Sequence, residues 1–227
     1  MIDEIKKEIM RYAHSERVYD ASRFFKTGKG QYGEGDKFLG LYMPEIRKIS
    51  HKFKNTDFSD IQILLDSEIH EERLLGLLIL VEQFPKDSEK VYNFYLENIK
   101  AVNNWDLVDL TADKIVGHYL FDKDKKILYD YTKSNNLWKR RISIISTFYF
   151  IKKNEFKDAL KISELLLKDK QDLIHKAVGW MLREIGKRNQ KVEESFLNKF
   201  YKEMPRTMLR YSIEKFDKEK REYYMKK

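Results

Sequence analysis

The sequence of 227 residues contains no cysteine. This absence excludes disulfide bonds, catalysis by a thiol and any metal site built on thiolates. Only three prolines are present, so few positions interrupt a helix. The longest apolar run, Leu74 to Val81, is far shorter than the roughly 20 residues of a membrane span, and the first residues lack the continuous apolar segment of a signal peptide. We expect a soluble, cytoplasmic protein with no membrane association.

The charges that are present are biased towards positive. Lysine and arginine total 45 against 37 for aspartate and glutamate, which gives a formal net charge of +8. A basic excess favours an anionic partner, with nucleic acid ahead of an acidic membrane surface. A basic surface without any such partner is the alternative, and the charge alone is compatible with both.

Apolar residues recur with a helical period over nearly the whole chain, and no segment shows the alternation of a strand. Charged residues reach 36% of the chain, and hydrophobic residues, at 42%, suffice for a substantial core. This composition is typical of helical proteins. We predict helices at residues 2–13, 16–27, 44–54, 58–67, 70–84, 87–101, 104–120, 124–134, 137–153, 156–168, 173–188, 191–203 and 206–216.

The second helix of each expected pair has a similar pattern. These helices begin near His70, Trp105, Lys139 and His175, a spacing of about 35 residues that is typical of two-helix repeats. Such repeats stack into a curved solenoid whose concave side is a binding surface. We therefore predict an all-α solenoid in a single domain spanning residues 1–227, with a globular helical bundle as the alternative.

One glycine-rich segment, residues 26–44, interrupts the helical pattern and holds five of the nine glycines. It is not a phosphate-binding Walker A loop, because no Lys-Ser or Lys-Thr follows at the required spacing. It also lacks the preceding strand of a dinucleotide-binding fingerprint. We interpret the segment as a connector, with backbone contact to a ligand as the alternative.

Trp180 lies away from the apolar stripe of its expected helix. Its neighbours on that face are Lys176, Arg183 and Lys187. A large aromatic side chain among cations suits contact with the backbone and sugars of a nucleic acid. Burial of the indole by the adjacent repeat is the alternative.

Two neighbouring arginines stand at the start of a segment, residues 138–151, that is apolar nearly all round. Arg141 shares a face with apolar side chains, so its guanidinium needs a carboxylate or phosphate partner. Arg140 points elsewhere, towards solvent or a phosphate. Further along, Arg206 and Arg210 lie one helical turn apart and form a candidate phosphate-holding pair, with solvated surface arginines as the alternative.

Asp109 is the acid of this segment whose position is explained neither by the helix dipole nor by a polar face. Asp106 suits the dipole of a first helical turn, and Asp113 is expected on the polar side. Asp109 instead falls on the expected buried side, four residues after Trp105. A carboxylate beside an indole can stabilise a cation or activate water. A structural ion pair with Arg141 is the alternative.

Other catalytic patterns are missing. The histidines show no metal-ligand spacing such as HExxH, and no G-x-S-x-G nucleophile motif is present. We therefore expect neither a metal ion nor a cofactor.

Five segments together carry a resemblance to a known family. Through these segments, which follow one another in the family's order within residues 33–216, the chain resembles the AlkD-type DNA alkylation repair family. Members of this family are alkylpurine DNA glycosylases built of HEAT-like repeats. The resemblance implies antiparallel helix pairs in a solenoid of right-handed curvature with a basic concave face. The segments are GEGDKFLGLYMPEIRK, NNWDLVDLTADKIVG, LWKRRISIISTFYFI, LIHKAVGWMLREIGK and MPRTMLRYSIEKF.

The resemblance also implies an active cleft of one aspartate, one arginine and two tryptophans. The matching positions are Asp109, Arg141, Trp105 and Trp180, and none is substituted. Phosphate contacts are expected from the cations named above. These are Arg140, Lys176, Arg183, Lys187, Arg206 and Arg210.

The activity that the resemblance implies is hydrolysis of the N-glycosidic bond of purines alkylated at N3 or N7. Asp109 would stabilise an oxocarbenium-like sugar and position a water molecule. The expected partner is double-stranded DNA with alkylated bases, and the expected oligomeric state is a monomer. The alternative is a non-catalytic helical-repeat module that binds a DNA structure or a protein.

Overall fold

The computed structural model describes residues 1–226. These residues form helices joined by turns and by one longer segment, residues 25–42, and the single strand-like feature among them is an isolated bridge between Lys37 and Ile69. The all-α prediction is therefore confirmed, whereas the curvature of the solenoid and the single domain remain predictions. No helix within residues 1–226 has both the length and the apolar character needed to cross a bilayer.

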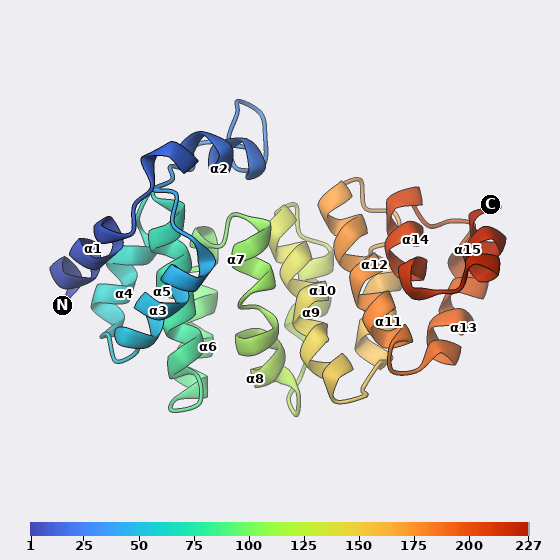
Figure 1. The fold of residues 1–227 in the computed structure, drawn as a ribbon. Coiled ribbons are helices and arrows are strands. Elements are labelled where there is room, and N and C mark those ends of the chain that lie inside the picture. The colour runs from blue at the N-terminus through green and yellow to red at the C-terminus, as the bar shows by residue number, and fades with distance from the viewer. Residues whose placement is uncertain (227) are drawn as a thin grey trace. The chain divides into compact units, whose positions relative to one another are not determined.

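The contacts of the chain divide it into two compact units, Met1–Thr111 and Ala112–Lys227. In the first unit, α5 is the central helix, packed against α3 and α4 and buried from His70 to Leu80. Figure 1 shows α2 standing apart from the group formed by α3 to α6. The helices are α1 (Ile2–Arg11), α2 (Val18–Phe24), α3 (Met43–Lys52), α4 (Phe58–Leu65), α5 (His70–Gln83), α6 (Ser88–Glu97) and α7 (Trp105–Asp109).

The second unit is built around α10 and α12. The helix α10 is buried over most of its surface, as its apolar sequence predicts, and α12 packs between α10 and α14. The helices are α8 (His118–Leu120), α9 (Lys126–Thr132), α10 (Leu137–Lys152), α11 (Lys157–Leu165), α12 (Asp172–Gly186), α13 (Gln190–Phe200), α14 (Arg206–Ser212) and α15 (Lys218–Met225).

The helix predicted over residues 104–120 is broken, which corrects the sequence prediction. The helix α7 ends at Asp109, and a π-helical turn, Asp113–Gly117, precedes α8. The wide turn is closed by a bond from the Gly117 amide to the Ala112 carbonyl, 2.8 Å long. A side chain on Gly117 would collide with the Ser146 carbonyl of α10, so only glycine permits this approach.

The break in the helix changes which side chains are buried. Residues 110–112 between α7 and the π turn form no regular helix, so the face of Asp113 does not follow from that of α7. Asp113, expected on the polar side, is 2% exposed instead. Its carboxylate accepts a hydrogen bond from Lys152 Nζ at 2.5 Å.

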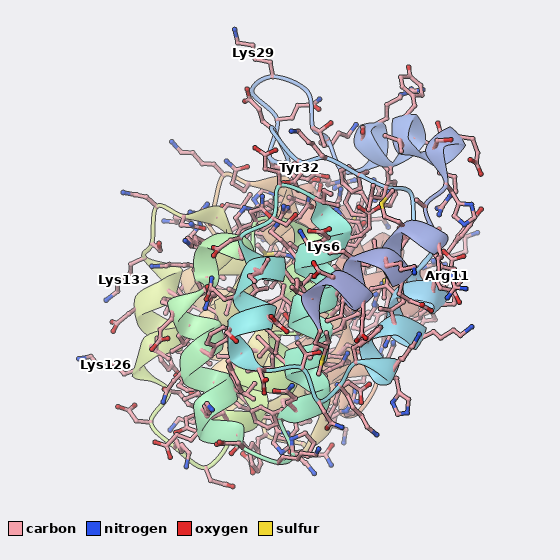
Figure 2. The ribbon with its side chains drawn as sticks, turned by 90° about the vertical axis from the view of Figure 1, so that its left-hand side faces the viewer. Lys6, Arg11, Lys29, Tyr32, Lys126 and Lys133 are labelled. Carbon is pink, nitrogen blue, oxygen red and sulfur yellow. The ribbon has the colours of Figure 1, made fainter. Side chains whose placement is uncertain are left out.

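The glycine-rich segment is an ordered connector between α2 and α3. Figure 2 shows Lys29 reaching outward at its tip. Its base is held by Glu71 of α5, whose carboxylate accepts bonds from the amides of Leu39 and Gly40. Gly40 has φ +83° and lies against the His14 carbonyl, which leaves no room for a side chain.

A buried acid in the second unit makes the stability of the fold depend on pH. Glu193 of α13 is 1% exposed, and its Oε1 has no hydrogen-bond partner within residues 1–226. Burial and the nearby Glu194 raise the pKa of Glu193 to about 9. The folded state therefore keeps a proton that the unfolded chain loses near pH 4.5, so stability falls as the pH rises between these values.

We expect Glu193→Gln to raise the free energy of unfolding at pH 7 by about 1–3 kcal/mol, because the amide needs no proton. The gain should shrink towards pH 4.5. Urea unfolding at several pH values measures both effects. The exposed Glu203 provides the control variant, Glu203→Gln, which should leave the pH slope unchanged. An equal slope in wild type and Glu193→Gln would contradict the prediction.

Candidate functional site

The short helix α7 begins with one predicted catalytic residue and ends with another. Asn104 caps its start, and the Asn104 side chain accepts a bond from the Trp105 amide at 2.8 Å. Trp105 and Asp109 are four residues apart and both are partly exposed, so one accessible face of α7 carries both side chains. The sequence placed Asp109 on the buried side, and this is corrected. Asp106 is the buried carboxylate of α7, 7% exposed.

Aromatic side chains from α2 and its end fix the indole of Trp105. The ring of Phe25 stacks on it with centroids 5.5 Å apart, and the ring of Phe24 meets it edge-on at 5.7 Å. Such arrangements favour one orientation of the indole. Phe24 and Phe25 were not among the predicted site residues, although the two adjacent phenylalanines in RFFK were a visible signal.

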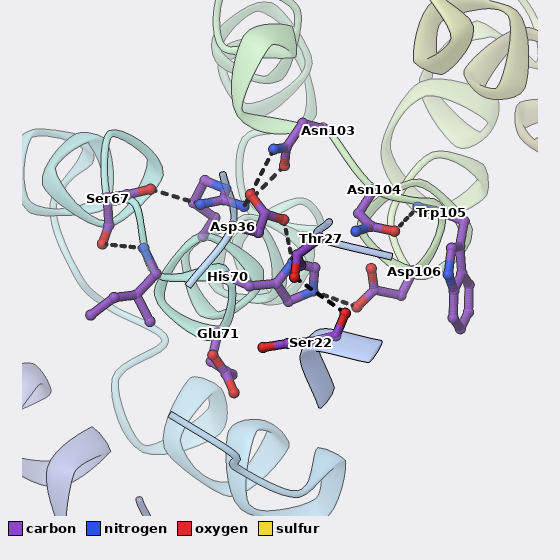
Figure 3. Close-up of polar contacts among 12 residues, drawn as sticks. Ser22, Thr27, Asp36, Ser67, His70, Glu71, Asn103, Asn104, Trp105 and Asp106 are labelled. Carbon is purple, nitrogen blue, oxygen red and sulfur yellow. Dashed lines mark hydrogen bonds and ion pairs between the residues drawn. The ribbon is translucent and has the colours of Figure 1, made fainter. Parts of the chain in front are cut away.

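A cluster of buried charges lies directly behind this face. His70, the first residue of α5, is 1% exposed. Its Nδ1 lies 3.2 Å from an oxygen of Asp36, and its Nε2 lies 2.8 Å from an oxygen of Asp106. Arg73 and Asn103 donate to the other oxygen of Asp36, at 2.7 and 2.9 Å. Figure 3 shows His70 between the two carboxylates and Trp105 beside Asn104.

The charges in this cluster stabilise one another. Burial lowers the pKa of His70, but the two carboxylates outweigh it and raise the pKa to about 9. Burial likewise works to raise the pKa of Asp36, but the bond from His70 and the charge of Arg73 hold it below its ordinary value. Sequence reasoning missed the cluster, because His70 lies 34 and 36 residues from its acids. Within residues 1–226, no group of acids and histidines is arranged to hold a metal ion.

In the second unit, Arg141 is buried in α10, 4% exposed. Its guanidinium donates to the backbone carbonyl of Leu173 at the start of α12. Trp105 and Asp109 belong to the first unit, and Arg141 and Trp180 to the second. The cleft common to these four residues stays a prediction, as does an ion pair between Asp109 and Arg141.

Trp180 is partly exposed on α12, and its ring lies 5.6 Å from that of Phe148 on α10. Glu184 follows one turn later. Burial works to raise the pKa of Glu184, but bonds from Lys187, Arg188 and the Trp180 indole lower it below its ordinary value. The Trp180 indole is thus anchored by a carboxylate and keeps an accessible part.

Several cations that were predicted to bind phosphates have acidic partners in the structure. Lys176 pairs with Asp172 at 2.7 Å, Lys187 contacts Glu184 at 2.5 Å, and Arg183 pairs with Glu214. These pairs reduce the positive charge around Trp180. In contrast, Arg206 and Arg210 are exposed along α14.

The expected orientation of Arg140 towards solvent is corrected, and its contact with a phosphate stays a prediction. Its side chain is 15% exposed, and Nε donates to Asp169 at 2.6 Å. Nη1 donates to the carbonyl groups of Ser134 and Asn135. Arg140 therefore links the turn before α10 to the turn before α12.

One family model matches most of the chain. A model of the family described as DNA alkylation repair enzyme matches residues 5–216. The chain belongs to this family. The fold is similar to that of a solved structure described as a predicted DNA alkylation repair enzyme from Enterococcus faecalis. That structure is similar over 91% of this chain and 97% of its own, with a TM-score of 0.76 and 16% identity.

The resemblance carried by the five sequence segments to the DNA alkylation repair family is confirmed. A search of curated proteins gave no match. At 16% identity, the structural likeness establishes the shared fold. The chemistry of this member of the family must therefore be argued from its own side chains.

Proposed function

We propose that the protein is a monofunctional alkylpurine DNA glycosylase that acts as a cytoplasmic monomer on double-stranded DNA. The observation that supports this most is the accessible face of α7, where Asp109 lies one turn from an indole fixed by Phe25. A carboxylate held beside an ordered aromatic ring suits a reaction that develops positive charge on a sugar. Membership of the DNA alkylation repair family points to alkylated DNA as the source of that sugar.

The proposed reaction is hydrolysis of the bond between C1′ and a purine alkylated at N3 or N7. Such a base is cationic, and the electron pair of the breaking bond neutralises it, so the departing base needs little help from an acid. Asp109 stabilises the oxocarbenium-like deoxyribose by its charge. It also accepts a proton from the water whose oxygen bonds to C1′. The products are the free base and an abasic site.

The other predicted residues have supporting roles in this proposal. Trp105 and Trp180 offer π faces to the sugar and backbone of the damaged nucleotide. Arg141 orients Asp109 or holds a phosphate beside the lesion. The reaction as written needs only water and side chains of this chain. Among the predicted arginines, Arg206 and Arg210 are the exposed ones and are the candidates for phosphate contacts on a basic concave face.

The test is a base-release assay on duplex DNA methylated to carry N3-methyladenine and N7-methylguanine. We expect the protein to release the free bases, measured by chromatography, and to leave abasic sites that break in alkali. The alternative function, a non-catalytic module for a DNA structure or a protein, predicts binding without release. Binding of methylated DNA with no released base at any enzyme concentration would overturn the proposal.

The proposed DNA contacts predict a steep dependence of binding on salt. Each phosphate contact contributes about −0.9 to the slope of log K against log salt concentration. We expect Arg206→Ala/Arg210→Ala to make this slope shallower by about 2 and to weaken binding. Titration of labelled duplex DNA at several salt concentrations measures it. Lys126→Ala/Lys133→Ala removes two exposed cations at α9 and is the charge-matched control. Equal slopes for the two double variants would contradict the assignment.

A further inference from the structure

His70 has a carboxylate oxygen within hydrogen-bond distance of each ring nitrogen. A neutral imidazole carries one N–H, so it would place a lone pair against one of these oxygens. The imidazolium donates to both Asp36 and Asp106. With Arg73, the cluster then holds two positive and two negative charges and is neutral as a whole. Geometry and charge balance thus both favour the protonated ring.

The proton joins three segments that are distant in the sequence. Asp36 belongs to the glycine-rich segment, His70 begins α5, and Asp106 belongs to α7. The second oxygen of Asp106, Oδ1, is buried without a hydrogen-bond partner within residues 1–226. His70 is therefore the group that balances the charge of Asp106.

The helix α7 depends on such contacts. It has five residues, far fewer than the roughly 12 that an isolated helix needs to be even marginally stable. Phe25 and Phe38 both lie with ring centroids 4.8 Å from that of His70. Because Phe25 also stacks on Trp105, the imidazolium and the indole are coupled through one ring as well as through Asp106.

We propose that His70 is a positioning residue: as an imidazolium it fixes Asp106, and thereby the orientation of α7 that presents Trp105 and Asp109. This inference rests on the proposed glycosylase function. His70 itself does not touch the reacting atoms. It acts by holding the helix that carries the reacting carboxylate, in the way that supporting shells hold catalytic groups in other enzymes.

The surroundings of His70 define the pH range in which its imidazolium fixes Asp106. The charged groups that face the ring are Asp36 and Asp106, and Arg73 lies behind Asp36. Glu71, on the same helix, is directed to the amides of Leu39 and Gly40. Since the pKa is raised to about 9, the proton is held at neutral pH and lost only in alkaline solution.

The test compares single-turnover base release and histidine NMR between pH 6 and 10. We expect the wild-type rate to fall with a midpoint near the pKa of about 9 while the far-ultraviolet circular dichroism stays native. We expect His70→Gln to lower the rate roughly 10- to 100-fold, because small misplacements of a catalytic group have such effects. The affinity for DNA should change less than about threefold, since α7 would be misoriented and not lost.

His70→Gln leaves the charge of Asp106 unpaired and could unfold for that reason. A second variant keeps the test decisive in that case. His70→Gln/Asp106→Asn removes one charge of each sign, so it should fold and should lack the alkaline fall in rate. The control is His51→Gln, which changes an exposed histidine and should keep the fall, separating it from alkaline changes in the DNA. A wild-type rate and pH profile in the double variant would overturn the proposal.

The NMR measurement separates this inference from the proposed function. At pH 7 the His70 ring should show two bound N–H protons, and the indole N–H signal of Trp105 should shift as His70 titrates. Failure of base release at every pH would refute the glycosylase function alone, because the Trp105 signal still reports the orientation of α7. A single N–H on His70 at pH 7 would overturn the positioning role. A Trp105 signal that does not shift as His70 titrates would also overturn it.

Discussion

Asp109→Asn should lower the rate of base release by at least about 10³-fold. The asparagine side chain has nearly the same shape, so α7 and the packing around Trp105 should persist. The substitution removes both the negative charge that faces the developing sugar cation and the acceptor for the water proton. The affinity for DNA should be equal or slightly higher, because a negative charge beside phosphates is lost.

The measurement is single-turnover release from methylated duplex DNA with enzyme in excess, together with a binding titration. Asp113→Asn is the matched control, because Asp113 is a nearby acid whose partner is Lys152. This control should cost stability but keep the rate within a few-fold of wild type. Full activity of Asp109→Asn would refute the catalytic assignment. Equal losses in both variants would indicate that damage to the fold, and not chemistry, explains the effect.

The second large effect is expected from Gly179→Ala. Gly179 lies in α12 directly before Trp180, where α12 closely approaches α14. A Cβ at this position would lie 2.5 Å from the Met208 carbonyl oxygen and 2.5 Å from the Cβ of Tyr211. These atoms belong to the backbone of α14 or are fixed to it, so the whole helix would have to move.

We expect Gly179→Ala to lower the free energy of unfolding by about 3 kcal/mol, despite the roughly 1 kcal/mol that alanine contributes to a helix. Displacement of α14 should also weaken DNA binding through Arg206 and Arg210. Urea unfolding and DNA titration test the two effects. The comparison is Gly76→Ala in α5, where the three atoms nearest to the new methyl group are side-chain atoms of Leu64 and Leu65, at 3.0 to 3.4 Å. That variant should stay within about 1 kcal/mol of wild type. Wild-type stability in Gly179→Ala would contradict the prediction.

Much of the fold was predictable because its determinants are local. Apolar periodicity located the helices, and a pattern apolar on all sides identified α10 as the buried helix of the second unit. The five segments identified the family, since each combines unusual residues at fixed spacing. Trp105 and Asp109 were paired correctly on one face, because four residues separate them within a single regular turn of α7.

The burial of Asp106, Asp109 and Asp113 was not predictable by the same route. Periodicity assumes one regular helix over residues 104–120, whereas α7 ends at Asp109 and a π turn begins at Asp113. The turn fits the close approach of Gly117 to α10, a contact between residues about 30 positions apart.

The acidic partners of the predicted phosphate-binding cations could not be predicted from the sequence, for a related reason. Arg140 meets Asp169 and Arg183 meets Glu214, pairs that are 29 and 31 residues apart. A sequence reveals that a cation lies on a polar face, but only the packing of one helix against the next shows which acid it meets. The predicted phosphate contacts therefore divide into paired cations and the two exposed arginines of α14.

The neutral quartet of Asp36, His70, Arg73 and Asp106 has a consequence for the divergence of this protein. Loss of any one member leaves a buried charge unbalanced, which costs several kcal/mol in a small domain. Single replacements should thus be purged, and the members should be inherited or lost in pairs of opposite sign. Relatives that lack the histidine are expected to lack one of its two acids, so the quartet should mark a lineage within the family.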